Sequence, residues 1–478
     1  MSSNISDFSA TLVSALSEFE FATIAQLSDG LENKRFSATE LLDDVIARLE
    51  PLEAKLNMFA TLDIKGAQAD ARAAEARQMR GERLSVLDGI PTSIKDLIAQ
   101  RGLPQQFGSL TTPKKPSPVD APSVERLRAA GAVLLGKSTT SEFGCKAVGD
   151  NPLNGITRNP WNTDLTPGGS SCGAAAMVAA GLIPYALGTD GGGSVRIPAA
   201  LCGLFGMKGQ FGRVPVFPTS ATPTLAHVGP LTRSVTDSAI VMQVISGHDR
   251  RDPFSVAGPV PDFLEATKTE RKLKIAYSPT LGFARPSDDV LQCVEEAVQN
   301  MSALGHSVEK VDQVMEDPVN LWNAEFYAGV GTKLRSVIDD TPELIDPAVL
   351  EVLRVAISQE MGDYYSKVFK RYDFREKMRQ LFEMYDVLLS PTVPVTAFPL
   401  GLNVPETLLD RTLVSWVFYT YPFNLTGQPA ASLPVGFSEE GLPVGMQVVG
   451  RTNDEATVFN LCGQYEVHHN VLDRRPDI

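Results

Sequence analysis

A serine preceded by three glycines is the strongest chemical signal in the sequence. Ser194 follows Gly191, Gly192 and Gly193 directly, within the segment Gly-Thr-Asp-Gly-Gly-Gly-Ser-Val-Arg-Ile-Pro that spans residues 188–198. Glycines let consecutive backbone N–H groups line a concave loop, and such a loop beside a nucleophile is what an oxyanion hole requires. The alternative interpretation is a glycine-rich turn whose serine does no chemistry.

Two features upstream could serve a nucleophilic serine. Ser170 and Ser171 follow a pair of glycines and supply hydroxyl groups, and Lys95 is the one lysine in a strand-like stretch with apolar neighbours. Serine nucleophiles in acyl transfer need a base and a path for their proton. Each signal alone would be weak, but together they favour nucleophilic catalysis over an idle turn.

A second glycine-rich string, Gly131-Ala-Val-Leu-Leu-Gly-Lys-Ser138, fits the P-loop pattern letter by letter. The four residues between its glycines are apolar and strand-forming, whereas a phosphate cradle needs a loop with free N–H groups after the strand. We therefore interpret this string as the end of a buried strand. A nucleotide-binding protein is kept as an alternative from a different functional class.

A G-x-S-x-G string centred on Ser171 would be the nucleophile elbow of an α/β-hydrolase. That elbow needs a strand directly before it, and residues 159–167 make a poor strand. It also needs a downstream acid and histidine. This alternative mechanism is therefore weaker than one built on Lys95.

The five histidines give no metal site. His468 and His469 are adjacent and diverge on a helix, His227, His248 and His306 are isolated, and no cysteine pair has ligand spacing. None of the five lies in an evident active-site context, so surface or hydrogen-bonded positions are expected. Neither a metal nor a cofactor is expected.

Three motifs, in order, resemble the amidase signature family. They are Gly89-Ile-Pro-Thr-Ser-Ile-Lys95-Asp, Thr166-Pro-Gly-Gly-Ser170-Ser171 and Gly188-Thr-Asp-Gly-Gly-Gly-Ser194-Val-Arg-Ile-Pro-Ala199; the segments 159–161, 424–429 and 441–447 are similar to it as well. The resemblance implies an α/β fold, the amidase signature fold, with a mixed central sheet covered on both faces by helices. It also implies a serine amidohydrolase that cleaves a carboxylic amide through an acyl-enzyme.

The resemblance assigns roles to particular residues. It makes Ser194 the nucleophile, Ser170 the bridging serine and Lys95 the general base, with a cis peptide bond between Gly169 and Ser170. A lysine must be neutral to accept a proton, and burial among apolar neighbours lowers its pKa. The backbone N–H groups around Gly191, Gly192, Gly193 and Ser194 would form the oxyanion hole, and the residues expected to hold these loops are Ser171, Asp190 and Arg196.

Three other positions are less well defined by the resemblance. Cys172 stands where the family usually has glycine, and we interpret it as a small buried packing residue. Gly144 and Cys145 fall where the family lines its acyl pocket. Trp322, Trp416 and the aromatic cluster at 418–421 could contact an aromatic substrate, but core packing is the better interpretation for most of them.

Two amide-hydrolysing functions compete. One is a free-standing amidase acting on aryl, alkyl or primary amides. The other is the glutamine-hydrolysing A subunit of a tRNA-dependent amidotransferase, which usually carries Asp-Thr-Gly-Gly-Ser where this chain has Asp190-Gly-Gly-Gly-Ser194. That difference favours the free-standing amidase.

The elements that must position these residues alternate between helix and strand, as in α/β folds. Helices are predicted at 38–50, where a capping box at Ser37 begins the helix and Pro51 is expected to stop it, and at 64–80, 123–130 and 234–245. Strands are predicted at 132–135, 273–277, 386–389, 431–435 and 444–449. A mainly helical insert is expected over about 286–384, and residues 1–478 are expected to form one domain.

Composition excludes several classes of partner. The chain has 478 residues, 43% of them hydrophobic, and 43 basic against 57 acidic residues give a net charge of −14. Such a balance disfavours nucleic-acid binding, and no stretch is long and apolar enough for a membrane span. Five widely spaced cysteines and no visible signal peptide indicate the cytoplasm. A small-molecule amide is the expected partner, and family members often dimerise.

Overall fold

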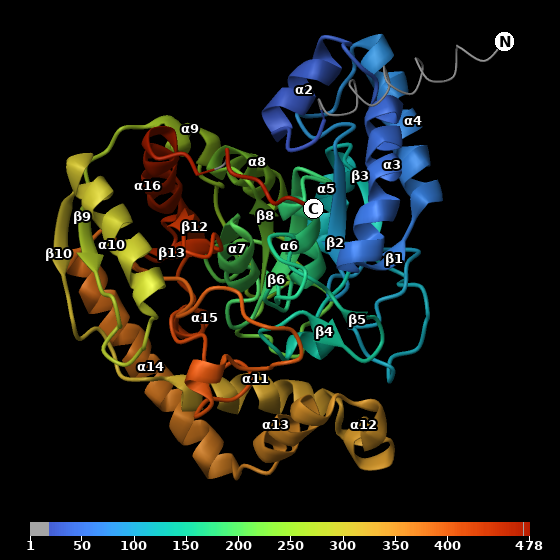
Figure 1. Ribbon diagram of the computed structural model, residues 1–478. Helices are drawn as coiled ribbons and strands as arrows, with labels where there is room; N and C mark the ends of the chain where they lie inside the picture. Colours follow the sequence, from blue (N-terminus) through green and yellow to red (C-terminus); the bar gives the residue numbers. More distant parts are fainter. Residues whose placement is uncertain (1–18, 472) are drawn as a thin grey trace.

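The computed structural model describes residues 19–471 and 473–478, and its centre is a large mixed sheet (Figure 1). In these residues the sheet has 11 strands in the order β1-β3-β2-β6-β8-β7-β12-β13-β11-β9-β10. The strands are β1 (Phe59–Leu62), β2 (Pro91–Lys95), β3 (Val133–Ser138), β6 (Tyr185–Asp190), β7 (Phe205–Lys208), β8 (His227–Thr232), β9 (Lys274–Tyr277), β10 (Ser307–Lys310), β11 (Val387–Pro391), β12 (Ala430–Phe437) and β13 (Pro443–Gly450). A separate two-stranded ribbon joins β4 (Asp150–Asn151) and β5 (Gly155–Ile156).

Helices surround this sheet. They are α2 (Ile24–Glu32), α3 (Ala38–Leu56), α4 (Ile64–Arg80), α5 (Pro122–Ala129), α6 (Cys172–Ala179), α7 (Arg196–Cys202), α8 (Val235–Ile245), α9 (Phe263–Lys268), α10 (Asp288–Ala303), α11 (Val319–Lys333), α12 (Arg335–Asp340), α13 (Pro347–Ile357), α14 (Met361–Met384), α15 (Pro422–Thr426) and α16 (Glu455–His468). Figure 1 shows α11 to α14 gathered at the lower edge of the molecule. Within the described residues no helix has the length and apolarity needed to cross a bilayer.

Both faces of the central part of the sheet are buried, as predicted, whereas the edge strand β10 is mostly exposed. Successive side chains of a strand point to opposite faces. On β3, Leu134 packs with α5 and α8 in one apolar cluster, whereas Val133 and Leu135 pack with α4 and α6 in another. Residues 133–135 of β3 thus form a continuous apolar run, which is typical of a strand covered on both sides.

The helix that begins at Ser37 is longer than predicted. Ser37 accepts a hydrogen bond from the backbone N–H of Glu40 and forms the expected capping box, but α3 continues through Pro51 to Leu56. Leu56 is completely buried, so packing against the core favours another turn despite the missing proline N–H. Asn57, in a left-handed conformation, then ends the helix.

The insert predicted at 286–384 is not wholly separate from the sheet. Its first part contains α10 and the edge strand β10, which pairs in parallel with β9. Periodicity did not indicate β10 because its residues, Ser307 to Lys310, are mostly exposed and polar. The helices α11 to α14 follow, and α11 lies against the loop that comes after β6.

Sheet topology brings the chemical motifs to one edge. β2 ends at Lys95 and β6 ends at Asp190, and the two strands are parallel neighbours. The carboxyl ends of parallel strands meet at the same edge of a sheet, so Lys95 lies beside the loop that carries Ser194. Ser170 and Ser171 come to the same edge because they directly precede α6.

Candidate active site

Lys95 lies at the centre of a cluster of hydroxyl groups. Its Nζ is 2.6 Å from Ser170 Oγ, 2.9 Å from Ser171 Oγ and 3.0 Å from Thr189 Oγ1. A hydroxyl can both donate and accept a hydrogen bond. The cluster can therefore satisfy an ammonium, which donates three bonds, and also a neutral amine, which donates two and accepts one.

Burial tunes this lysine toward the neutral form. The Lys95 side chain is fully buried, and loss of hydration lowers its pKa from 10.5 to about 7, although the negative charge of Asp190 opposes the shift. An amine with such a pKa is substantially unprotonated near neutral pH. It can then accept a proton from Ser170, to which it is hydrogen-bonded.

Ser194 and Ser170 both line one cavity and are supplied by adjacent loops. The backbone N–H of Ser171 donates to the Ser194 carbonyl (3.2 Å), which fixes the two loops together, and the Gly169–Ser170 peptide is cis, as the resemblance implies. Ser194 keeps 9% of its surface exposed. Its Oγ has no hydrogen-bond partner within the described chain, so it is free to meet a substrate carbonyl.

The glycine loop differs from expectation at one position. The N–H of Gly193 donates to Asp190 Oδ1 (2.8 Å) and is therefore already used. Among the described residues, the N–H groups of Gly191, Gly192 and Ser194 have no protein acceptor. The expected oxyanion hole thus loses Gly193 as a free donor and retains the other three N–H groups.

A buried ion pair between Asp190 and Arg196 supports this loop. Asp190 and Arg196 are fully buried, and the guanidinium donates to both carboxylate oxygens, at 3.0 and 2.9 Å. Burial would raise the pKa of Asp190, but the Arg196 charge outweighs it and holds that pKa well below its usual range. The remaining guanidinium contacts are Gln447 Oε1 (2.6 Å), Asn424 Oδ1 (2.8 Å) and the Thr420 carbonyl (3.0 Å).

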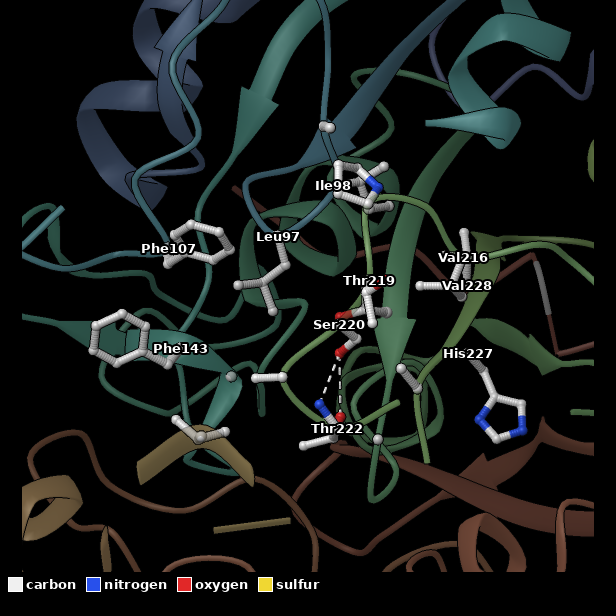
Figure 2. A pocket seen from close by; sticks show the side chains of 18 of the residues that line it. Leu97, Ile98, Phe107, Phe143, Val216, Thr219, Ser220, Thr222, His227 and Val228 are labelled. Carbon is white, nitrogen blue, oxygen red and sulfur yellow. Dashed lines mark hydrogen bonds between the residues drawn. The ribbon is translucent and has the colours of Figure 1, made fainter. Parts of the chain in front are cut away.

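The cavity above the loop holds about 460 Å³ and is mostly apolar. Figure 2 shows Leu97, Phe107 and Phe143 on one side and Val216 and Val228 on the other. Among the described residues that line it, only Asp190, His227 and Lys333 have ionisable side chains, and that of Asp190 is completely buried. An uncharged substrate with an apolar group suits such walls.

Of the two predicted pocket residues, only Gly144 lines the cavity. It has a positive φ of 73°, and a side chain there would come within 3.3 Å of Ser170 Oγ. The prediction for Cys145 is wrong, because its side chain is completely buried in the apolar core behind the wall. Cys172 is also buried, with its Sγ 3.6 Å from Thr139 Oγ1, as expected of a packing residue.

His227 corrects the expectation that all five histidines lie outside the active site. It lines the cavity (Figure 2), because antiparallel pairing of β8 with β6 places it opposite Asp190. Its Nδ1 faces the carbonyls of Leu225 (2.8 Å) and Asp190 (3.1 Å), and Lys208 Nζ lies 3.4 Å from its Nε2. Burial, reinforced by the Lys208 charge, lowers the pKa of His227, so it is a neutral support for the loop.

The competing motifs lack the geometry that their chemistry needs. Residues 133–138 of the P-loop-like string form the fully buried strand β3, so their N–H groups are not free to bind phosphate. Ser171 is not preceded by a strand, which excludes the nucleophile elbow. Within residues 19–471 and 473–478, no three His, Cys, Asp or Glu side chains form a group that could hold a metal ion.

Several contacts of the site were not predicted from the sequence. Thr189 lies within the motif itself, and its position next to Asp190 at the end of a strand could have indicated it. Thr420 Oγ1 donates to the Gly192 carbonyl (2.7 Å), and Asn424 Nδ2 donates to Asp190 Oδ1 (2.9 Å). Both contacts join positions more than 200 residues apart, so the family-like segment at 424–429 did not by itself show where Asn424 would lie.

Comparison with known proteins agrees with this arrangement. The family model described as Amidase matches residues 40–459. The chain is 35% identical to the A subunit of the glutamyl-tRNA(Gln) amidotransferase of Chloroflexus aggregans, over 97% of this chain and 99% of that protein, and 33% identical to an acylamidase of Rhodococcus erythropolis, over 94% and 96%. A bacterial aryl acylamidase of the amidase signature family superposes with a TM-score of 0.88 at 27% identity, covering 96% of this chain and 99% of that one. The chain therefore belongs to the amidase signature family, whose enzymes hydrolyse amide C–N bonds.

Proposed function

We propose that this chain is a serine amidase in which Ser194, Ser170 and Lys95 form a proton relay. Ser194 Oγ attacks the amide carbonyl carbon while its proton passes to Ser170, and the Ser170 proton passes to Lys95 Nζ. The relay then runs in reverse and protonates the departing amine as the C–N bond breaks, which leaves an ester between the acyl group and Ser194. Water, deprotonated through the same relay, releases the acid.

The observation that carries this proposal is the hydroxyl cluster around a fully buried lysine. Ser170 Oγ lies 2.6 Å from Lys95 Nζ, within the reach that proton transfer requires. The N–H groups of Gly191, Gly192 and Ser194 would stabilise the oxyanion that forms at the carbonyl oxygen. Each such donor is worth roughly 10²–10³ in rate in other acyl-transfer enzymes.

For the substrate we propose an aryl, alkyl or primary amide with an apolar group, as in a free-standing acylamidase. Free glutamine carries both an ammonium and a carboxylate, and each would need an opposite charge in the site. Among the described lining residues Lys333 is the only cation, and its Nζ donates to the Thr219 carbonyl (2.9 Å). Asp190, the only carboxylate, is already paired with Arg196.

Glutamine hydrolysis within an amidotransferase complex is the second candidate. It is favoured by the match to the A subunits of such complexes over nearly the whole chain, and the identities, 35% against 33%, do not separate it from the acylamidase. That candidate requires partner subunits, whereas the first acts alone or as a homodimer. The five free cysteines fit the reducing cytoplasm, where we place the activity.

Product release from a panel of amides tests the proposal. The panel contains glutamine, short aliphatic amides, benzamide and acetanilide, assayed with the wild type and with Ser194→Ala. We expect the wild type to cleave an apolar amide and the variant to lose that activity. Cleavage of glutamine alone would favour the amidotransferase function, and equal activity of both proteins would exclude Ser194 as the nucleophile.

A further inference from the structure

The helix α11 lies directly against the loop that carries Ser194. Its Trp322 donates from Nε1 to the carbonyl of Gly191 at 2.8 Å, and the indole is almost completely buried. The Gly191–Gly192 peptide is trans, so its N–H points away from its carbonyl. The hydrogen bond from Trp322 holds the Gly191 carbonyl toward α11. It therefore holds the Gly192 N–H on the other side of the peptide, pointing away from α11.

Two rings of α11 occupy the space that side chains on this loop would fill. A Cβ atom at Gly191 would lie 2.8 Å from Phe326 Cε2, and one at Gly192 would lie 2.7 Å from Trp322 Cζ2. Real Cβ atoms essentially never approach this closely. The two glycines and the two rings thus form one closely fitted contact between α11 and the loop.

The two rings differ in what else they touch. Trp322 and Phe326 are stacked, with ring centroids 4.4 Å apart and planes 18° apart. Phe326 lines the cavity together with Val330 from the next turn, whereas Trp322 lies behind it and does not line the cavity. One ring therefore faces the substrate space, and the other faces the backbone of the loop.

We propose that the Trp322–Phe326 pair sets both the preference for aryl amides and the orientation of the oxyanion loop. This inference rests on the proposed function. Phe326 is the wall on which a planar group of the substrate stacks beside the scissile amide, and Trp322 is a positioning residue that holds the Gly191–Gly192 peptide. Aromatic stacking adds to the burial of apolar area, so a planar ring gains more from this wall than a puckered ring of equal size.

Phe326→Leu tests the specificity of the wall. Two pairs of substrates differ mainly in ring planarity: benzamide with cyclohexanecarboxamide, and acetanilide with N-cyclohexylacetamide. We expect the wild type to prefer the planar member of at least one pair and the variant to lose about 3-fold to 10-fold of that preference. Phe382→Leu is the matched control, because Phe382 is equally buried in the same apolar cluster but does not line the cavity.

Trp322→Phe tests the positioning role. It keeps a ring in the stack but removes the N–H that holds the Gly191 carbonyl. We expect kcat to fall about 10-fold for planar and puckered substrates alike, with KM changed less than about 3-fold, because the loop stabilises the transition state. The matched control is Trp416→Phe, since the buried Trp416 Nε1 has no hydrogen-bond partner among the described residues.

The outcomes separate this inference from the proposed function. If the wild type cleaves no amide in these pairs while Ser194 reacts with no serine-directed phosphonate, the proposed function fails. If the wild type is active but shows no planar preference, or Phe326→Leu and Phe382→Leu behave alike, the specificity role is wrong. A change confined to KM in Trp322→Phe, or the same fall in kcat in Trp416→Phe, overturns the positioning role.

Discussion

Two buried lysines on adjacent strands differ in a way that separates the proposed base from a structural cation. Lys95 ends β2, and Lys137 lies on β3, where it pairs with Ile94 in the parallel ladder. Both are fully buried, and burial lowers their pKa values to about 7 and about 8. Burial alone therefore does not separate them.

The hydrogen-bond partners of the two lysines distinguish them. Lys95 is surrounded by the hydroxyls of Ser170, Ser171 and Thr189, which can donate as well as accept. Lys137 donates to the Ile98 carbonyl (2.6 Å) and lies 3.5 Å from the Asp96 carboxylate, and both partners accept only. The Asp96 carboxylate favours the charged form of Lys137, and neither partner can donate to a neutral amine, whereas the hydroxyls around Lys95 can pair with it in both protonation states.

The largest expected effect is the loss of catalysis in Lys95→Met. Methionine is a flexible side chain of similar length but carries no amine, so nothing remains to take the proton from Ser170. We expect kcat/KM to fall by about 10³- to 10⁴-fold, with the thermal midpoint retained. The measurement is steady-state hydrolysis of the best amide from the panel, together with thermal unfolding of both proteins.

Lys137→Met should lower the stability of the protein and leave its activity nearly unchanged, which is the reverse of what we expect for Lys95→Met. It leaves the buried Asp96 without its cation, and breaking such a pair costs about 3–5 kcal/mol of unfolding free energy. We expect kcat/KM of the folded enzyme to stay within about 3-fold of the wild type. Denaturant unfolding checks the first part, and a loss of activity as large as that of Lys95→Met would remove the distinction between the two lysines.

The pH dependence sharpens the comparison further. The pKa of Lys95 is lowered to about 7, so the neutral, basic form is the minor species below pH 7 and the major one above it. We expect kcat/KM to rise about 10-fold from pH 6 to pH 8 and then to level off. Lys137→Met should show the same profile, and an optimum on the acid side would exclude an amine base.

The smallest expected effect is that of Thr189→Val. It removes one of the three hydroxyls around Lys95 while keeping the shape of the side chain, and we expect kcat/KM to fall about 5-fold with a shifted pH midpoint. Thr92→Val is the matched control, because Thr92 is a buried threonine of β2 whose hydroxyl donates to the Tyr185 carbonyl at 3.0 Å. Equal effects of the two substitutions would make Thr189 merely structural.

The residues of the proposed relay could be singled out from the sequence because each lies in a short motif with its own chemical signature. The three glycines before Ser194 and the serine pair at 170–171 are local patterns, and so is the lysine at the end of an apolar stretch. The alternation of apolar strands with helices indicated an α/β fold, whereas the mixed sheet covered on both faces was what the family resemblance implied. Local signals of this kind can be recognised without knowledge of the tertiary structure.

The remaining contacts depend on which distant segments meet. Gln447 holds Arg196 across 251 residues, and Thr420 holds Gly192 across 228. The register between β6 and β8 places His227 in the site. The pattern of apolar residues along the sequence does not determine that register. Gly193 was expected to be a free donor because glycine spacing shows which N–H groups are accessible, but not which of them a neighbouring carboxylate already binds.

Titration of Lys95 itself is the most direct test. Side-chain NMR of isotope-labelled lysine in the Ser194→Ala protein would follow each amine with pH, with the signals of Lys95 and Lys137 assigned from Lys95→Met and Lys137→Met. We predict that Lys95 loses its proton with a midpoint near pH 7. A Lys95 that stays protonated up to pH 10 would contradict its role as the base.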